Sequence, residues 1–566
     1  MPVRRTSYPQ VDPRARGLMR PGLVVVPPDV TVALAARLAN RRQARLVAAR
    51  LGGAEWTAAT PETLRRALGL GLHRAPLLAV LWDAPLEPAK ASEVAVRRRL
   101  DPAHPFLLVG DRRQPEGVVF REPRTATGLP LSVERELDRL PGPVGEILRI
   151  AGAQGETLGH PVAAVGGLVR DLLLGRVDAR TDLDLVVDGR AAAVAQAAAR
   201  ELGGKTVEHP AFLTATVIPP DGRRIDFATA RREAYRAAGA LPVVERTSLA
   251  EDLGRRDFSL NALAIRLDGA ERGRLVDTTG GLADLRARRI RVLHPLSFVE
   301  DPTRILRAAR FAARLGCRID PTTRRLAAQA ARLDVYRALS GDRLRTELEL
   351  LLAEPSPVAA LREAGRLGAW RLLGAPAPLG REASRRLTAA LAPRALAGLA
   401  PDTPVGLCLL ALTEGTPAIE AWMDRLSLAP ARRESIRGAR RDAPRLIARL
   451  ADVREWSAAY GILSGMPELT LAWTRALAGP SVARRQVDRH LRSGRRIRPL
   501  ATGDDVAALG VPPGPEIGAI LRGLRAAQAD GHVRSRTGAL RWLQGTVARG
   551  RGRGEAALTR PGRRGG

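Results

Sequence analysis

The sequence predicts an α+β protein in which an N-terminal repeat of small β and α units precedes a mixed-sheet domain and an all-helical C-terminal half. Strand and helix patterns repeat loosely within residues 11–124, with one half near 18–82 and another near 83–124. From Val162, short apolar strands alternate with helices. Beyond Ser297 the sequence is helical almost to its end. A chain of 566 residues is too long for one compact core, so we expect several domains.

Local signals define the elements of the N-terminal repeat. Residues 24–42 predict a strand, a Pro-Asp turn and an amphipathic helix. Thr60 followed by Pro61 predicts the start of another helix, because a threonine cap and an early proline favour a helix N-terminus. Residues 106–109 and 117–120 predict two strands joined by a turn.

The mixed-sheet domain is predicted from strands bounded by turn residues. A strand at 162–165 ends at a pair of glycines, and a short helix at 168–175 and an alanine-rich helix at 190–202 follow. The other predicted strands are 183–187, 214–218 and 224–228. The last two flank the sequence PPDG, a strong hairpin turn.

Charge is the strongest signal in the composition. The chain has 91 basic and 59 acidic residues, a formal charge of +32 and a pI near 11.5. A cationic surface attracts phosphate backbones, and arginine binds phosphate oxygens bidentately, so the composition predicts a nucleic-acid partner. Aromatic residues make up only 3%, which disfavours RNA recognition by a platform of stacked rings.

Cysteine content and hydropathy exclude other classes of protein. Two cysteines, Cys317 and Cys408, are too few for a disulfide scaffold or a cysteine-rich zinc site. No apolar run approaches the roughly 18 residues of a membrane span, and the N-terminus leads into no apolar signal core. We therefore expect a cytoplasmic protein that does not enter a membrane.

Asp182 and Asp184 are the candidate catalytic residues. They begin a strand as residues i and i+2, so both carboxylates point to the same face, and two hard oxygen ligands suit Mg²⁺. Upstream, Gly166 and Gly167 lie at a strand-to-helix junction, where backbone N–H groups can approach a phosphate. Arg170 adds a cation in the first turn of that helix. Together these residues predict a site for metal-dependent phosphoryl transfer.

The segment VGGLVRDLLLG followed by DLD resembles the first motif of class II tRNA nucleotidyltransferases and bacterial poly(A) polymerases. Four further segments resemble the later motifs in that family's order: 224–233, 252–264, 300–311 and 339–348. The resemblance covers roughly residues 160–350. It implies an enzyme in which the 3′-hydroxyl of an RNA attacks the α-phosphate of ATP or CTP.

The resemblance also implies roles for individual residues. Asp182 and Asp184 hold one or two Mg²⁺ ions, and Arg256 contacts the nucleotide. Asp226 lies on a strand that could run beside theirs, where it is a third carboxylate at the metal, a ribose acceptor or a paired surface residue. Arg255 makes either a salt bridge or a substrate contact. No histidine falls in the motifs as a general base, so the metal has to lower the pKa of the hydroxyl.

A helix that follows an acidic pair carries arginines at positions 304, 307, 310 and 314, all on one face. In the family that it resembles, Asp301 and Arg304 read the incoming base, Glu300 orients the arginine, and Arg307 and Arg310 contact phosphate or ribose. The residues expected to bind nucleotide are therefore Gly166, Gly167, Arg170, Asp226, Arg256, Glu300, Asp301, Arg304, Arg307 and Arg310.

The regions outside these motifs carry weaker resemblances. Residues 64–81 resemble the linker of a degenerate CBS-domain pair in a subgroup of these enzymes. The CBS ligand positions are poorly kept at 60–62, which favours dimerisation or regulation over adenosine-nucleotide binding. A homodimer through this region is the expected assembly. Residues 502–533 are similar to the C-terminal region that holds tRNA, although an ordinary helical hairpin fits equally well.

The patterns divide the chain into five parts. These are a degenerate CBS pair (1–135), a nucleotidyltransferase head (136–290), a helical neck with the base-reading helix (291–355), a helical body and tail that bind tRNA (356–547), and a disordered basic tail (548–566).

The expected product is the 3′-terminal CCA of tRNA, or only its terminal A, and the two activities are nearly equally favoured. The segment 234–253 is long, whereas the family's CC-only enzymes shorten a loop here. Residues 209–218 lack the basic signature of bacterial poly(A) polymerases, which leaves poly(A) synthesis as a second, less favoured activity. A catalytically silent RNA-binding protein is the competing interpretation from another class, and the intact Asp182, Asp184, Asp301 and Arg304 disfavour it.

Overall fold

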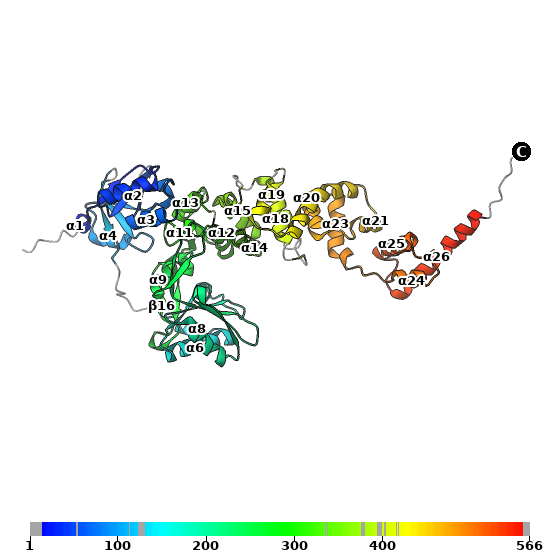
Figure 1. Cartoon of the computed structure of the whole chain (residues 1–566), viewed down its shortest axis with the longest axis horizontal. Helices are drawn as coiled ribbons and strands as arrows, with labels where there is room; N and C mark the ends of the chain where they lie inside the picture. Colours follow the sequence, from blue (N-terminus) through cyan, green and yellow to red (C-terminus); the bar gives the residue numbers. More distant parts are fainter. Residues whose placement is uncertain are drawn as a thin grey trace, which may run out of the picture. The chain divides into compact units, whose positions relative to one another are not determined.

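The computed structural model describes residues 14–52, 55–111, 114–122, 131–333, 335–336, 338–374, 380–392, 399–400, 403–414, 416 and 418–558. The chain divides into two units, Met1–Pro378 and Leu379–Gly566. Each unit is described by itself, with its elements labelled as in Figure 1.

The predicted N-terminal repeat is confirmed as two copies of one β–α–β–β topology, which we call the N-terminal module (residues 14–122). The first copy consists of β1 (Leu23–Val25), α2 (Val32–Arg41), β2 (Leu46–Gly52) and β3 (Glu55–Ala59). The second consists of β5 (Leu86–Pro88), α4 (Glu93–Arg99), β6 (Phe106–Gly110) and β7 (Pro115–Phe120). In both copies the first strand pairs in parallel with the second, and the second pairs antiparallel with the third.

The helix that links the two copies begins where the sequence predicts. It is α3 (Pro61–Gly69), and the side chain of Thr60 accepts a hydrogen bond from the backbone N–H of Thr63 at 3.2 Å. Pro61 occupies the first turn, where the missing N–H costs no helical hydrogen bond. The short β4 (Trp82–Asp83) then completes the first sheet.

The head contains a seven-stranded mixed sheet in the order β10-β11-β12-β9-β8-β15-β16. Its strands are β8 (Val162–Val165), β9 (Leu183–Val187), β10 (Lys205–His209), β11 (Thr214–Ile218), β12 (Ile225–Thr229), β15 (Ala264–Arg266) and β16 (Leu275–Val276). Only β12 and β9 pair in parallel; the other neighbours in this sheet are antiparallel. The predicted mixed sheet and the β11–β12 hairpin are confirmed.

Two helices cover one face of the head sheet, α6 (Gly142–Thr157) and α8 (Ala191–Glu201). The helix α6 lies so close to the sheet that a Cβ at Gly152 would be 2.2 Å from the carbonyl oxygen of Leu267. Glycine is therefore required for this packing. After β12 come the hairpin β13 (Arg231–Ala234) and β14 (Val243–Arg246), and then α9 (Leu249–Gly254).

Four described helices lie in the predicted neck, α11 (Ser297–Glu300), α12 (Thr303–Leu315), α13 (Pro321–Ala330) and α14 (Gly341–Leu352), and α15 (Pro357–Arg366) follows them. The helix α12 packs against both α14 and α15. Most of α12 is buried, including Arg304 and Arg310, so its arginine-bearing face is not an ordinary solvated surface.

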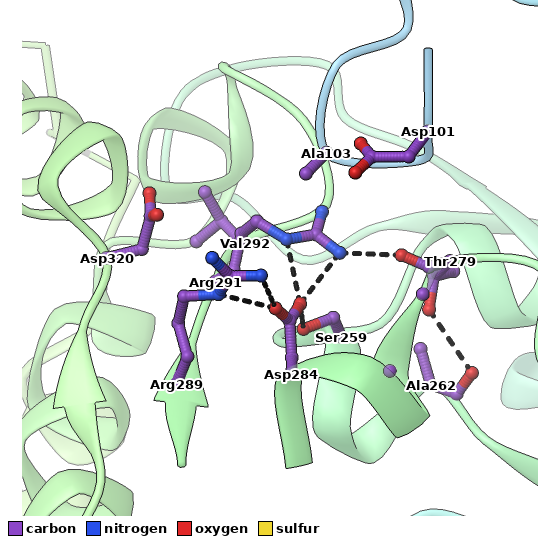
Figure 2. A network of polar contacts seen from close by, with 12 residues as sticks. Asp101, Ala103, Ser259, Ala262, Thr279, Asp284, Arg289, Arg291, Val292 and Asp320 are labelled. Carbon is purple, nitrogen blue, oxygen red and sulfur yellow. Dashed lines mark hydrogen bonds and ion pairs between the residues drawn. The ribbon is translucent and has the colours of Figure 1, made fainter. Parts of the chain in front are cut away.

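A buried polar network joins the head to the neck (Figure 2). Its centre is Asp284 on α10 (Gly281–Arg286), whose side chain is fully buried. Its carboxylate accepts hydrogen bonds from Arg289 Nε at 2.6 Å, Arg291 Nε at 2.8 Å and the Ser259 hydroxyl at 2.6 Å. Both arginines lie at the strand β17 (Arg289–Ile290) that leads into the neck.

The second unit consists of helices in its described residues. They are α16 (Arg381–Ala390), α18 (Thr403–Thr413), α19 (Ile419–Arg425), α20 (Pro430–Leu450), α21 (Trp456–Leu463), α22 (Glu468–Leu477), α23 (Val482–Arg492), α24 (Gly503–Ala507), α25 (Pro515–Ala529) and α26 (Arg536–Leu558). Residues of α20, α21, α22 and α23 form one apolar cluster, and residues of α24, α25 and α26 form a second. The predicted all-helical C-terminal half is confirmed for this part of the chain.

The disordered tail expected at 548–566 stays a prediction. The helix α26 continues to Leu558, and residues 559–566 lie outside the described residues. The Gly/Arg-rich sequence suggested too little apolar surface to fold, but Leu543 and Val547 anchor the preceding turns in an apolar cluster and the helix extends from them. None of the described helices is long and apolar enough to cross a membrane.

Candidate active site

The head sheet brings the predicted carboxylates together on neighbouring strands. Asp182 directly precedes β9 and Asp184 lies within it, while Leu183 and Leu185 are buried. Strands β9 and β12 pair in parallel with Asp226 opposite Asp184, which confirms that the strand of Asp226 runs beside the catalytic strand. Both Asp182 and Asp184 line a cavity of about 790 Å³.

Asp226 itself lies outside the wall of this cavity in the described residues. Its Oδ1 accepts the hydroxyl hydrogen of Thr216 at 2.6 Å, and Arg224 Nη2 is 3.9 Å away. Asp226 therefore has partners of its own in this structure, next to the two cavity carboxylates.

The carboxylates create an electrostatic environment that suits a divalent cation. Burial raises the pKa of Asp184, and the nearby charges of Asp226 and Asp182 raise it further, while Arg256 and Arg307 lower it. Within the described residues, no three His, Cys, Asp or Glu side chains form a ready metal cluster. Mg²⁺ commonly uses one or two carboxylates together with substrate phosphates, so this donor set fits it.

The glycine turn lies directly beside these carboxylates. Gly166 has φ +69°, a conformation that side chains with a Cβ rarely adopt. A Cβ at this position would be 3.4 Å from Arg256 Nη1 and 3.8 Å from Asp184 Oδ2. The turn between β8 and α7 (Gly167–Leu173) thus lies between the acidic strand and an arginine, as a phosphate-binding turn requires.

Arg170 lines the cavity but is tightly held within it. Its side chain is buried, forms two hydrogen bonds to Asp171 and donates to Asn261 Oδ1 at 2.7 Å. The guanidinium also lies 5.4 Å from the centre of the Phe311 ring. Its position is thus set by the protein before any ligand arrives.

Arg255 and Arg256 have different surroundings. Arg255 pairs with Glu233 and with Asp252 and donates to the carbonyl of Arg231, which favours the structural role left open by the sequence. Arg256 donates through Nη2 to Asp252 at 3.0 Å, and its Nη1 lies 3.4 Å from the position that a Cβ at Gly166 would take. Arg256 is therefore the one of the two shown beside the glycine turn.

The predicted base-reading residues also line the cavity. Arg304 is 6% exposed, and its two terminal nitrogens donate to Ser297 Oγ at 2.7 Å and to the carbonyl of Arg255 at 3.1 Å. Asp301 pairs with Arg343 at 2.9 Å and accepts a hydrogen bond from the Thr303 hydroxyl. Both side chains are fixed by the protein, as discrimination between bases requires.

The structure does not place Glu300 as the partner of Arg304. The carboxylate of Glu300 pairs with Arg66 of the N-terminal module at 2.6 Å and lies 3.5 Å from His294. In the described part of the chain, Ser297 and the carbonyl of Arg255 orient Arg304 instead. Glu300 is also outside the cavity wall.

Burial of His294 beside Glu300 gives a prediction about stability and pH. Burial lowers the pKa of His294 from 6.5 to about 4, although Glu300 raises it. Between these two values the unfolded chain binds a proton that the folded chain does not, so stability falls as the pH falls through this window. We expect a loss of about 3 kcal/mol by pH 4 from this residue. Denaturant unfolding of His294→Gln should show a flatter dependence on pH than the wild type, and equal slopes would contradict the assignment.

Arg307 and Arg310 line the cavity and are already paired with carboxylates. Arg307 binds Asp257 at 2.6 Å and Glu347 at 3.1 Å, and Arg310 lies 3.7 Å from Glu347 and 3.6 Å from Glu354. The sequence predicts the arginines but not these acidic partners. The spacing of Glu347 and Glu354 on and after α14 was the available signal, since seven residues is two helical turns.

Two further cavity residues have no signal of their own in the sequence. Phe311 has Arg170, Arg307 and Arg310 within 5.6 Å of its ring centre, so an apolar residue organises the cationic wall. Tyr235 also lines the cavity, and its hydroxyl donates to Glu233 at 2.7 Å.

Comparison with known proteins agrees with this geometry. Residues 162–291 match the family described as the poly A polymerase head domain, so the sheet and its carboxylates define a nucleotidyltransferase head. The A-adding tRNA nucleotidyltransferase of Geobacter sulfurreducens is 37% identical over 71% of this chain and 47% of its own length. The CC-adding tRNA nucleotidyltransferase of Deinococcus radiodurans is 40% identical over 66% of this chain and 86% of its own length.

Among solved structures, the Thermotoga maritima CCA-adding enzyme in complex with tRNA is 29% identical, with a TM-score of 0.59, over 74% of this chain and all of that one. The chain belongs to the tRNA nucleotidyltransferase family. It spans about half the length, or less, of the A-adding relatives that it matches.

Proposed function

We propose that this chain adds the 3′-terminal CCA of tRNA, or only its terminal A, from CTP and ATP without a nucleic-acid template. One observation carries the proposal: a single cavity contains both the acidic pair Asp182–Asp184 and the fixed pair Asp301–Arg304. The first pair suits phosphoryl transfer and the second suits reading a base edge by hydrogen bonds. The relatives that add A or CC to tRNA support the same reaction.

Different residues of the cavity are placed to bind the triphosphate and the base of the nucleotide. The turn at Gly166 and the guanidinium of Arg256 beside it are placed to bind the triphosphate next to Asp184. Asp301 offers an acceptor and Arg304 offers donors to the base, and their contacts with Arg343 and Ser297 keep both side chains in place. A nucleotide bound in this way presents its α-phosphate next to the acidic pair, where the 3′-hydroxyl has to enter.

Asp182 and Asp184 would hold Mg²⁺, which when bound lowers the pKa of the attacking hydroxyl and neutralises the pyrophosphate that leaves. The pKa of Asp184, raised by burial and by its acidic neighbours, supports this assignment, because a cation relieves that repulsion. None of the described residues that line the cavity is a histidine.

Three tRNA substrates test the product. Transcripts that end before CCA, after C and after CC are offered with labelled ATP and with labelled CTP separately. We expect incorporation of A into the CC-ended tRNA. Addition of A alone, with CTP unused on every substrate, would exclude full CCA synthesis; addition of C alone would contradict both activities and indicate a CC-adding enzyme like the Deinococcus relative.

The same assay tests poly(A) synthesis and a catalytically silent protein. Long A tails on RNAs without a tRNA fold would indicate a poly(A) polymerase. A wild type as inactive as Asp182→Ala, with Mg²⁺ and all nucleotides, would support a silent RNA-binding protein instead.

The proposal includes the other parts of the chain. The repeated topology of the N-terminal module supports a degenerate CBS pair, and its assembly into a homodimer stays a prediction. The helical body and tail expected at 356–547, most of which lies in the second unit, are proposed to bind tRNA, and the other domain boundaries expected from the sequence stay part of the proposal. A cytoplasmic location fits a tRNA substrate.

A further inference from the structure

The N-terminal module packs against the catalytic part of the first unit at several separate places. On the neck, Arg325 of α13 donates to the carbonyl of Leu81 from both terminal nitrogens at 3.1 Å and pairs with Asp83 at 3.0 Å. On the head, Pro102 lies 3.5 Å from the position that a Cβ at Gly280 would take. Figure 2 shows the neighbouring loop of the module beside the Asp284 network. The module is thus docked on the head and the neck of its own chain.

A further contact of the module involves Glu300, which directly precedes Asp301, one of the two predicted base-reading residues. Arg66, on α3 of the module, donates through Nη2 to Glu300 Oε1 at 2.6 Å. The side chain of Glu300 is only 6% exposed, whereas that of Arg66 is 46% exposed. His294 also lies near this carboxylate, but its pKa of about 4 leaves it uncharged at neutral pH. Among the described residues, Arg66 is therefore the cation that balances the buried Glu300.

Glu300 is in turn connected by hydrogen bonds to the side chain of Asp301, the predicted base-reading residue that follows it. Its backbone carbonyl accepts a hydrogen bond from Gly239 at 3.1 Å, and the carbonyl of Gly239 accepts one from Arg343 at 2.7 Å. The same Arg343 pairs with Asp301 at 2.9 Å. A chain of contacts therefore leads from Arg66 through Glu300 to the side chain of Asp301.

The charge of Glu300 also bears on Arg304, four residues further along the chain. Glu300 is among the acidic groups that raise the pKa of Arg304, so the two charges interact without a direct contact. Arg304 itself is bound to Ser297 and to the carbonyl of Arg255. Without Arg66, the buried Glu300 carboxylate would lose the cation that balances it, and the Glu300–Asp301 segment would have to shift, because an uncompensated charge is costly in the interior.

We propose that Arg66 is a positioning residue through which the N-terminal module controls nucleotide selection, by holding the Glu300 carboxylate and with it the segment that carries Asp301. The inference rests on the proposed function, because it assigns base reading to Asp301 and Arg304. Arg66 does not line the cavity and touches no substrate there. Its effect is on how the base is bound and not on the acidic pair that carries out the transfer.

The test compares Arg66→Ala with Arg65→Ala in the full-length chain. Arg65 is the exposed neighbour on the same helix and has the same side chain, so it controls for loss of a surface charge. With the tRNA end and nucleotide that the wild type uses, Arg66→Ala should raise the KM for the nucleotide on the order of tenfold and lower the preference for the correct nucleotide by a similar factor. The kcat and the KM for tRNA should change less than about threefold. Arg66→Lys, which keeps the charge, should restore most of the KM.

A double-mutant cycle shows whether Arg66 acts through Glu300. In the Glu300→Gln background, position 300 no longer carries a carboxylate for Arg66 to balance. Arg66→Ala should then change the KM for the nucleotide less than about twofold. Additive effects would overturn the proposed route. Equal KM and selectivity in Arg66→Ala and Arg65→Ala would overturn the inference as a whole.

Equilibrium binding of ATP separates this inference from the proposed function. We expect Arg66→Ala, but not Arg65→Ala, to raise the Kd for ATP on the order of tenfold, whether or not the enzyme turns over. If the wild type adds no nucleotide to any tRNA end but this difference in Kd is found, the proposed function fails and the role of Arg66 is supported. If the wild type is active and the Kd is unchanged, the proposed function is supported and the role of Arg66 is overturned.

Discussion

Asp184→Asn is expected to reduce nucleotide addition to tRNA by at least about 1000-fold, the largest effect of any single change considered for this chain. Asparagine has nearly the same shape, so the strand β9 and its pairing with β12 should be retained. The change removes one of the two anionic ligands proposed for Mg²⁺. Single-turnover incorporation of labelled nucleotide measures the effect.

The same strand offers a matched control. Asp188 directly follows the opposite end of β9 and does not line the cavity, so Asp188→Asn should retain activity within about threefold. Asp226→Asn then tests the third carboxylate. A loss as large as that of Asp184→Asn would place Asp226 at the metal, and near-normal activity would identify it as a strand residue paired with Thr216. Full activity in Asp184→Asn would refute the catalytic assignment.

Asp284→Asn is expected to destabilise the first unit by about 3–5 kcal/mol, because it leaves Arg291 buried without its counter-charge. Arg291 is 3% exposed, and its remaining contact is a hydrogen bond from Nη2 to the carbonyl of Thr279 at 2.6 Å. The packing around the network in Figure 2 is tight, since a Cβ at Gly281 would lie only 2.1 Å from the carbonyl oxygen of Ser259. A water molecule therefore cannot easily take the place of the lost negative charge beside Arg291. Urea unfolding of the purified chain measures the change.

An exposed ion pair of the head is the control for this experiment. Asp138, 59% exposed, pairs with Arg272 at 2.8 Å, and Asp138→Asn should change the free energy of unfolding by no more than about 1 kcal/mol. Equal effects of the two substitutions would show that the Asp284 network contributes no more to the free energy of unfolding than an exposed ion pair does.

Most residues of the candidate site could be grouped from the sequence, because they are close together in local motifs, and most of them line one cavity. Asp182 and Asp184 are two residues apart, and the strand period alone sets their common face. Gly166 precedes a helix, so the turn could be predicted from its neighbours. The sequence allowed the strand of Asp226 to run beside that of Asp184 without fixing it, and the pairing of the two strands shows that it does.

The errors concern contacts between residues distant in sequence. Arg66 and Glu300 are 234 positions apart, and no periodic pattern relates an arginine in the N-terminal module to an acid in the neck. The role predicted for Glu300 assumed that its partner would be the nearby Arg304. The partners of Arg307 were missed for the same reason, because Asp257 is 50 positions away and becomes a neighbour only when the head packs on α12.

Two arginines of the cavity are already paired with carboxylates of the protein itself. Asp257, Glu347 and Glu354 lie at Arg307 and Arg310, so an entering anion has to compete with these internal carboxylates for the same guanidinium groups. An anion of higher charge competes better, because the attraction grows with the charge. The internal ion pairs therefore favour polyanionic ligands over singly charged ones at this wall of the cavity.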